Sequence, residues 1–100
     1  MSIKGGAYAR FRRALETGNL AIIRGAAAEL PAVNLHDALA ILPVIAREEP
    51  DKYERAACRW LARLALEREV GLEEIGVALA ALGQLPERPA AGQTLKRLLA

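Results

Sequence analysis

The stretch Asp51–Leu64 reads DKYERAACRWLARL, and it decides the class of fold. Its large apolar side chains, Tyr53, Trp60 and Leu64, recur at spacings that place them on one face of an α-helix. No glycine or proline interrupts the stretch, and its alanines and leucines favour helix. We therefore predict an amphipathic helix whose apolar stripe faces a core.

The other side of the same helix carries a row of cations. Arg55, Arg59 and Arg63 follow one another at a spacing of i, i+4 and i+8, and Lys52 lies at the start of the row. On a helical wheel the row lies about 140° from the apolar stripe. Such a row is either a solvated charged face or a surface that binds carboxylates or phosphates, because guanidinium groups can bind both in a bidentate manner.

Helix-breaking residues divide the rest of the chain into further short helices. Gly18-Asn19, Pro31, Gly71 and Gly83 mark ends, and Asn34 has the side chain of an N-cap. Short connections favour antiparallel neighbours. The predicted helices are 7–17, 20–30, 35–48, 51–69, 72–82 and 90–100. We expect helix 20–30 to pair with 35–48 and helix 51–69 to pair with 72–82, with the two terminal helices flanking these pairs. Pro43 is expected to kink the third helix, because proline has no backbone N–H to donate.

The composition supports an all-α fold in a single domain over residues 1–100. Alanine and leucine are abundant, whereas aromatic residues make up 4% of the chain. The net charge of +2 is too small to imply a polyanionic partner by itself. The single cysteine, Cys58, cannot form an internal disulfide, and no apolar run approaches the roughly 20 residues needed to cross a bilayer. We expect a cytoplasmic protein with no membrane contact.

Weak internal similarity favours a helical repeat. A shift of the sequence by 37 residues aligns Leu35 with Leu72 and Leu42 with Leu79, and a shift by 31 residues aligns Arg24 with Arg55. The spacing matches a unit of two helices. Six short helices could then form a stacked array, an α-α superhelix or a bundle.

From Leu35 to Leu64 the chain resembles a HEAT repeat. The residues that carry the resemblance are Pro43 inside the first helix, Asp51 after it, and then Tyr53, Ala56-Ala57 and Leu61 in the second helix. The chain departs from the family at Glu54, where an arginine is usual. The resemblance implies paired antiparallel helices stacked side by side, with the second helix of each pair on a concave surface. Along that surface it would align seven candidate partner-binding residues: Arg24, Lys52, Arg55, Arg59, Arg63, Lys96 and Arg97.

Residues for catalysis are scarce. His36 and Asp37 are neighbours in the sequence, and neighbouring side chains on a helix point about 100° apart. Cys58 has arginine neighbours that could lower its pKa, but no second cysteine or positioned histidine accompanies it. No metal-ligand spacing or phosphate-binding loop is present. We therefore expect a protein that is not an enzyme and has no catalytic residues, metal or cofactor.

The interpretation from sequence is a protein-interaction or scaffolding module that binds an acidic protein segment through the arginine row. The alternative is binding of a nucleic-acid backbone through the same row, whereas a helix-turn-helix near the C-terminus fits poorly because its linker, 84–89, is long. The predicted helix 72–82 is apolar on almost every side. It must therefore be deeply buried or covered by a second copy in a homodimer.

Overall fold

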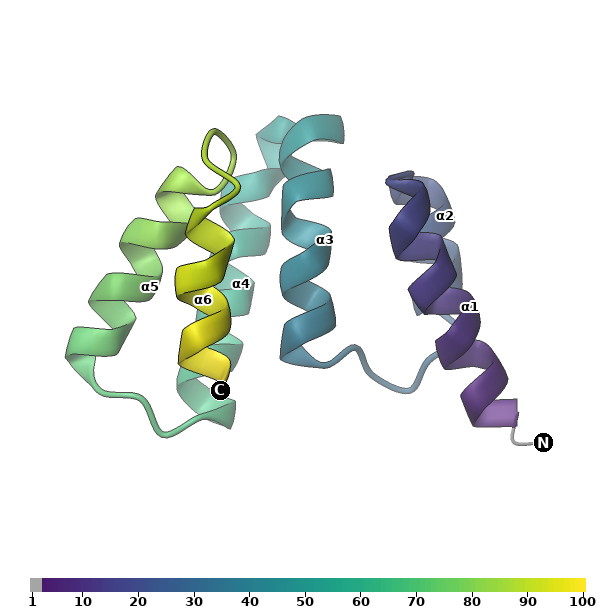
Figure 1. Cartoon of the computed structure of the whole chain (residues 1–100), viewed down its shortest axis with the longest axis horizontal. Helices are drawn as coiled ribbons and strands as arrows, with labels where there is room; N and C mark the ends of the chain where they lie inside the picture. The colour runs from purple at the N-terminus through teal and green to yellow at the C-terminus, as the bar shows by residue number, and fades with distance from the viewer. Residues whose placement is uncertain (1–2) are drawn as a thin grey trace.

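The structure, a computed structural model, describes residues 3–100 as six α-helices joined by short connections (Figure 1). This confirms the all-α prediction, and neighbouring helices pack as pairs: α1 with α2, α3 with α4, and α5 with α6. None of the described helices has both the length and the apolar character required to cross a bilayer. The helices are α1 (Ile3–Thr17), α2 (Leu20–Ala27), α3 (Leu35–Glu48), α4 (Pro50–Glu67), α5 (Leu72–Gln84) and α6 (Ala91–Leu99).

Local sequence signals explain most of the helix ends. The side chain of Asn34 accepts a hydrogen bond from the backbone N–H of Asp37 at 2.8 Å, which confirms the predicted N-cap of α3. The prediction for α2 was too long, because the N–H groups of Glu29 and Leu30 bond to carbonyls only three residues earlier and tighten the chain into turns. Helix α3 continues through Pro43 to Glu48 as one element.

Helices α3 to α6 close into a ring. Helix α3 packs against both α4 and α6, and α5 packs against the same two helices. In Figure 1, α4 forms the rear of the ring and α6 forms its front. One hydrophobic core fills the ring and takes residues from all four helices: Leu35, Leu39, Leu42, Tyr53, Ala57, Trp60, Leu64, Ala78, Ala81, Leu82, Leu95 and Leu99, with Leu85 and Ala91 from the α5–α6 connection and the start of α6. Helices α4 and α6 therefore lie on opposite sides of one core.

Helices α1 and α2 form an N-terminal hairpin with a core of its own. Phe11, Ala14, Leu20 and Ile23 are buried together with Val44, which comes from α3. The hairpin lies at the opposite end of the molecule from α5 (Figure 1). Helix α3 is thus shared, since one part of its surface enters the ring core and another part supports the hairpin.

A buried carboxylate also fixes the hairpin to α3. Asp37 is only 3% exposed, and it accepts hydrogen bonds from the Tyr8 hydroxyl at 2.9 Å and from the Arg12 guanidinium at 2.7 Å. Asp37 also lies in the first turn of α3, where its backbone N–H donates to the Asn34 cap. Its second role, as the polar contact between α1 and α3, follows from the packing of the two helices.

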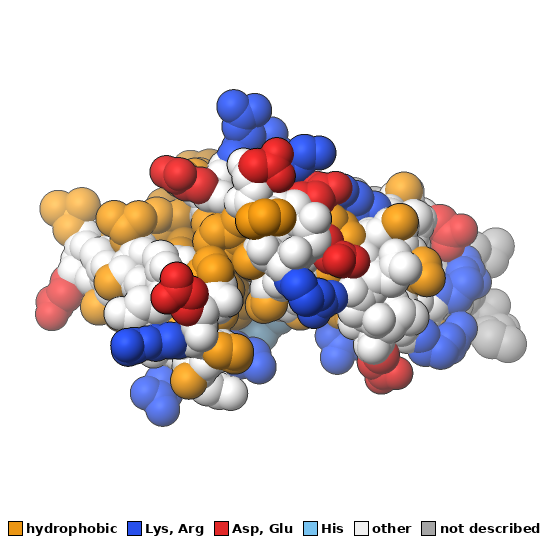
Figure 2. Space-filling model, turned by 90° about the horizontal axis from the view of Figure 1, so that it is seen from above, with side chains coloured by type: hydrophobic (Ala, Val, Ile, Leu, Met, Phe, Trp, Pro, Cys, Tyr) orange, Lys and Arg blue, Asp and Glu red, His pale blue; other side chains and the backbone are white. Residues whose placement is uncertain are grey.

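Helix α5 buries one face and leaves the other open. Ala78, Ala81 and Leu82 are buried in the ring core, whereas Leu72 is 90% exposed and Leu79 is 59% exposed. Figure 2 shows hydrophobic side chains gathered over this end of the molecule. The ring therefore covers only part of the apolar surface that the sequence predicted to need covering.

The buried phenol of Tyr53 provides a test of the ring core by pH. Its hydroxyl donates to the carbonyl of Leu82 at 2.6 Å, and burial raises the pKa of Tyr53 to about 12. In the unfolded chain the phenol ionises near pH 10, so its contribution to stability is complete below pH 10 and is lost as the pH rises toward 12. We expect the free energy of unfolding to fall by about 1–2 kcal/mol over that interval. Urea titrations at several pH values should show the fall in the wild type and a flatter profile in Tyr53→Phe; equal slopes would contradict the assignment.

Candidate functional site

A groove lies where α2, α3 and α4 meet. Its first section has a volume of about 400 Å³ and is lined by Arg24, Lys52, Arg55 and Arg59 together with Ile45, Asp51 and Ala56. The next section, of about 280 Å³, shares Ile45, Ala56 and Arg59 with the first. It continues along the α3–α4 pair and is lined also by Val33, Ala38, Ile41, Leu42, Trp60 and Arg63. We call the two sections together the basic groove.

The floor of the basic groove is apolar and its rim is cationic. The spacing of i, i+4 and i+8 on α4 places Arg55, Arg59 and Arg63 in succession along the rim. The floor comes largely from α3, where Ile41 and Ile45 are only partly buried. The sequence predicted the arginine row, but not the apolar floor, because periodicity does not show which neighbouring helix lies beside the row.

Some cations of the groove are already paired within the chain. Arg24 donates two hydrogen bonds to the Glu49 carboxylate, at 3.0 and 2.9 Å, and the Lys52 ammonium lies 3.5 Å from the same carboxylate. The hydrogen bonds between Arg24 and Glu49 lower the pKa of Glu49 and raise the pKa of Arg24. Arg63 pairs with Glu67 one helical turn away, at 2.7 Å.

Arg55 and Arg59 differ from these residues. Within residues 3–100, neither guanidinium has a carboxylate within 4.0 Å or a hydrogen-bond partner. Both side chains are exposed at the rim of the groove. The two arginines can therefore bind an external anion without first breaking an ion pair.

The seven candidate residues do not form one continuous surface. Five of them line the basic groove, but Lys96 and Arg97 are exposed on α6. Helix α6, which carries these two cations, packs against α3 and α5 and lies across the ring from α4, which carries the arginine row (Figure 1). In a stack of helix pairs, α4 and α6 would lie side by side, because each is the second helix of its pair. In the closed ring they instead face each other across the core.

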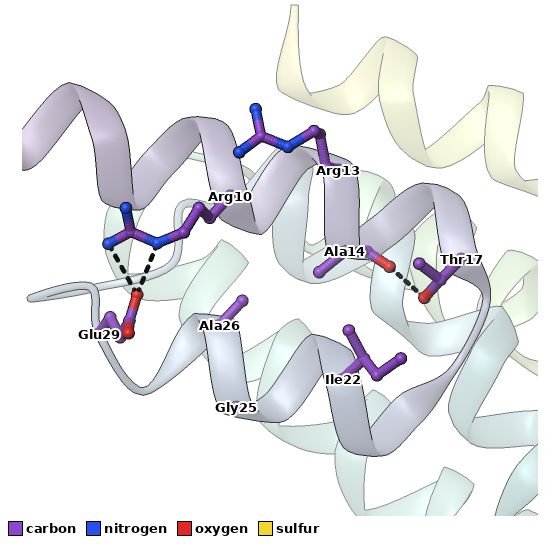
Figure 3. A pocket seen from close by; sticks show the side chains of 8 residues that line it. All are labelled: Arg10, Arg13, Ala14, Thr17, Ile22, Gly25, Ala26 and Glu29. Carbon is purple, nitrogen blue, oxygen red and sulfur yellow. Dashed lines mark hydrogen bonds and ion pairs between the residues drawn. The ribbon is translucent and has the colours of Figure 1, made fainter.

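A second groove, of about 390 Å³, lies between α1 and α2 (Figure 3). Its polar lining includes Arg10, Arg13 and Thr17 of α1. Arg10 donates two hydrogen bonds to Glu29, at 3.2 and 3.0 Å, and the Thr17 hydroxyl donates to the carbonyl of Ala14. These contacts use Arg10 and Thr17 within the chain, whereas Arg13 forms no ion pair or hydrogen bond with the described residues (Figure 3). This groove therefore offers one unpaired arginine, where the basic groove offers two.

The two residues weighed for catalysis lie apart from the basic groove. His36 is exposed in the first turn of α3, and Cys58 lines a pocket between α4 and α5. No group of three or more potential metal ligands occurs among the residues that the structure describes. Comparison of the chain with protein-family models, curated proteins and solved structures yields no significant match.

Proposed function

We propose that this protein is a non-enzymatic interaction module that binds an acidic, amphipathic segment of a partner protein in the basic groove. The observation that carries the proposal is the apolar floor beside two unpaired arginines, Arg55 and Arg59. A purely solvated charged face does not need such a floor. Apolar side chains of the partner would cover Ile41 and Ile45, and its carboxylates would bind the rim.

The dimensions of the groove suit a short segment. Arg55 and Arg63 are separated by two turns of α4, about 12 Å along the axis. A partner helix of two to three turns, with acids on one side and apolar residues on the adjacent side, would contact all three arginines and the floor. The proposal keeps from the HEAT resemblance the α3–α4 pair and the use of its second helix for binding, and it places the module in the cytoplasm.

Binding of a nucleic-acid backbone is the alternative, and the groove favours it less. Glu49 and Asp51 lie among the cations and would repel phosphates and the carboxylates of a partner protein alike, so they do not separate the two candidates. The apolar floor has no use in contacts to a phosphate backbone. A protein segment with apolar side chains accounts for the floor.

Replacing Arg55, Arg59 and Arg63 together with alanine is expected to weaken binding about 10- to 100-fold, because charge-assisted hydrogen bonds to three rim residues are lost. The probe is a fluorescent helical peptide with glutamates at i, i+4 and i+8 and leucines on the adjacent face. Fluorescence anisotropy measures its affinity, and circular dichroism checks that the variant stays folded.

The matched control removes three exposed cations elsewhere, Arg13, Lys96 and Arg97, so both variants lose the same net charge. Equal weakening in the two variants would reject the basic groove as the binding site. Retardation of duplex DNA at low salt, abolished only by the groove variant, would favour the nucleic-acid alternative.

A further inference from the structure

An acidic side chain begins the arginine row of the basic groove. Asp51, Arg55, Arg59 and Arg63 follow one another at intervals of four residues on α4, and all four line the groove. Side chains four residues apart lie along the same face of a helix. The rim therefore presents one carboxylate near the start of α4, followed by three guanidinium groups.

The acids at the two ends of this row differ in their pairing. Arg63 forms an ion pair with Glu67, four residues further on, at 2.7 Å. Asp51 has the same separation from Arg55, but it is exposed and has no cation within 4.0 Å among the residues that the structure describes. Asp51 and Arg55 therefore both keep charges that an external group can use.

The other charged side chains near Asp51 are paired with one another. Glu49 accepts two hydrogen bonds from Arg24, and its Oε1 atom lies 3.5 Å from Nζ of Lys52. Each of these three groups thus already has a neighbour of opposite charge. Among the described residues that line this end of the groove, Asp51 is the acid left without an ion pair.

This carboxylate selects among acidic partners. A segment that follows the whole row and carries only acids would place one of them against Asp51, where the two carboxylates repel each other. A lysine or arginine at the same place would form an ion pair. A polypeptide can present a cation one helical turn from a row of acids, whereas a phosphate backbone has no such group. The groove therefore asks for a particular order of charges and not only for negative charge.

The helix dipoles favour one direction for such a segment. Acids are favourable near the N-terminus of a helix and cations near its C-terminus. Glutamate is also better placed four residues before lysine than four residues after it. A segment with acids first and the cation last places its cation beside Asp51 when it runs antiparallel to α4. The opposed dipoles of the two helices then add to the attraction.

We propose that the partner of the basic groove is a helical segment whose acids are followed, one turn later, by a cation that pairs with Asp51. Its charges follow the order Glu-x3-Glu-x3-Glu-x3-Lys, antiparallel to α4. Asp51 and Arg63 are twelve residues apart, about 18 Å along the axis, so the bound segment has three to four turns, one turn more than the arginines alone require. The inference rests on the proposed function, because it names the partner of the same groove.

Two fluorescent peptides of identical composition test the position of the cation. Both have glutamates at i, i+4 and i+8 and leucines on the adjacent face. One has lysine at i+12, in line with the glutamates, and glutamine at i+14; the other exchanges these two residues, so that its lysine lies on the far side of the helix. Anisotropy titrations of the wild-type protein should show the first peptide binding roughly 2- to 5-fold tighter, as for one exposed ion pair.

Substitutions of Asp51 assign this preference to a residue. It should disappear in Asp51→Asn and reverse in Asp51→Lys, because the protein then presents a cation to the lysine. The control is Glu73→Lys, which changes the net charge equally at an exposed acid in the first turn of α5 and should keep the wild-type preference. A preference that survives in Asp51→Asn would place the partner's cation elsewhere and overturn the proposal.

The ratio of the two affinities separates recognition from stability. Asp51 lies in the first turn of α4, where an acid stabilises the helix, so Asp51→Lys should lower the Tm. That loss acts on both peptides alike and cancels in the ratio. Failure of both peptides to bind the wild type would reject the proposed function itself. Equal affinities that both depend on Arg55 and Arg59 would reject only the role of Asp51.

Discussion

Leu95→Ala is expected to lower the free energy of unfolding by about 3–4 kcal/mol. Leu95 is fully buried on α6, where it shares one core with Leu35 of α3 and Leu64 of α4. The truncation removes apolar contacts and leaves a cavity that the closed ring cannot readily fill. Because the core is continuous, all four helices of the ring should lose stability together.

Urea denaturation provides the measurement. The single tryptophan, Trp60, lies in the ring core and donates a hydrogen bond to the carbonyl of Leu35 at 2.9 Å, so its fluorescence reports on the ring. In Leu95→Ala, the fluorescence midpoint should fall to lower urea. Leu66→Ala, which truncates a leucine that is 87% exposed, should change stability by less than about 0.5 kcal/mol. If α6 detached while the Trp60 transition stayed in place, the ring would not be a cooperative unit.

Phe11→Ala should lower the free energy of unfolding by a similar amount, but the loss should fall on the N-terminal hairpin and not on the ring. Phe11 is fully buried in the core of the N-terminal hairpin, and its truncation should cost about 3–5 kcal/mol. The ring core shares no buried residue with the hairpin core, although Val44, Ile41 and Ile45 of α3 pack against the hairpin. We therefore expect the hairpin to unfold at lower urea than the ring.

Two probes followed together distinguish this outcome from global unfolding. Circular dichroism should show an early loss of helix in Phe11→Ala, while the fluorescence of Trp60 should change later. Ile22→Ala, at a half-exposed position of the same hairpin, should cost less than about 1 kcal/mol and keep the two transitions together. Coincident early transitions in Phe11→Ala would show that the hairpin and the ring unfold as one unit.

The local features of the fold could be predicted from the sequence. The apolar spacing of Tyr53, Trp60 and Leu64 correctly placed these residues in a core, and Asn34 correctly marked the start of α3. The pairing of Arg63 with Glu67 also follows from their separation of four residues. Each of these features depends on the geometry of a single helix, which the sequence specifies through propensity, spacing and capping.

Long-range pairings could not be predicted in this way. The bonds from Arg24 to Glu49 and from Tyr8 to Asp37 join residues on different helices, and no short-range pattern marks them. The apolar floor of the basic groove could not be predicted for the same reason, because it depends on the packing of different helices. The arginine row was visible in α4, but the side chains beneath its rim belong mainly to α3.

By itself, the sequence determined that the chain forms six short helices, where most of them begin and end, and which face of α4 is apolar. Only the tertiary structure decided that α3 to α6 close around one core and that α6, which carries Lys96 and Arg97, lies across it from α4. The physical reason is that burial of an apolar stripe is non-directional. The stripe specifies that a helix must be covered, and the packing of all the helices together decides which neighbour covers it.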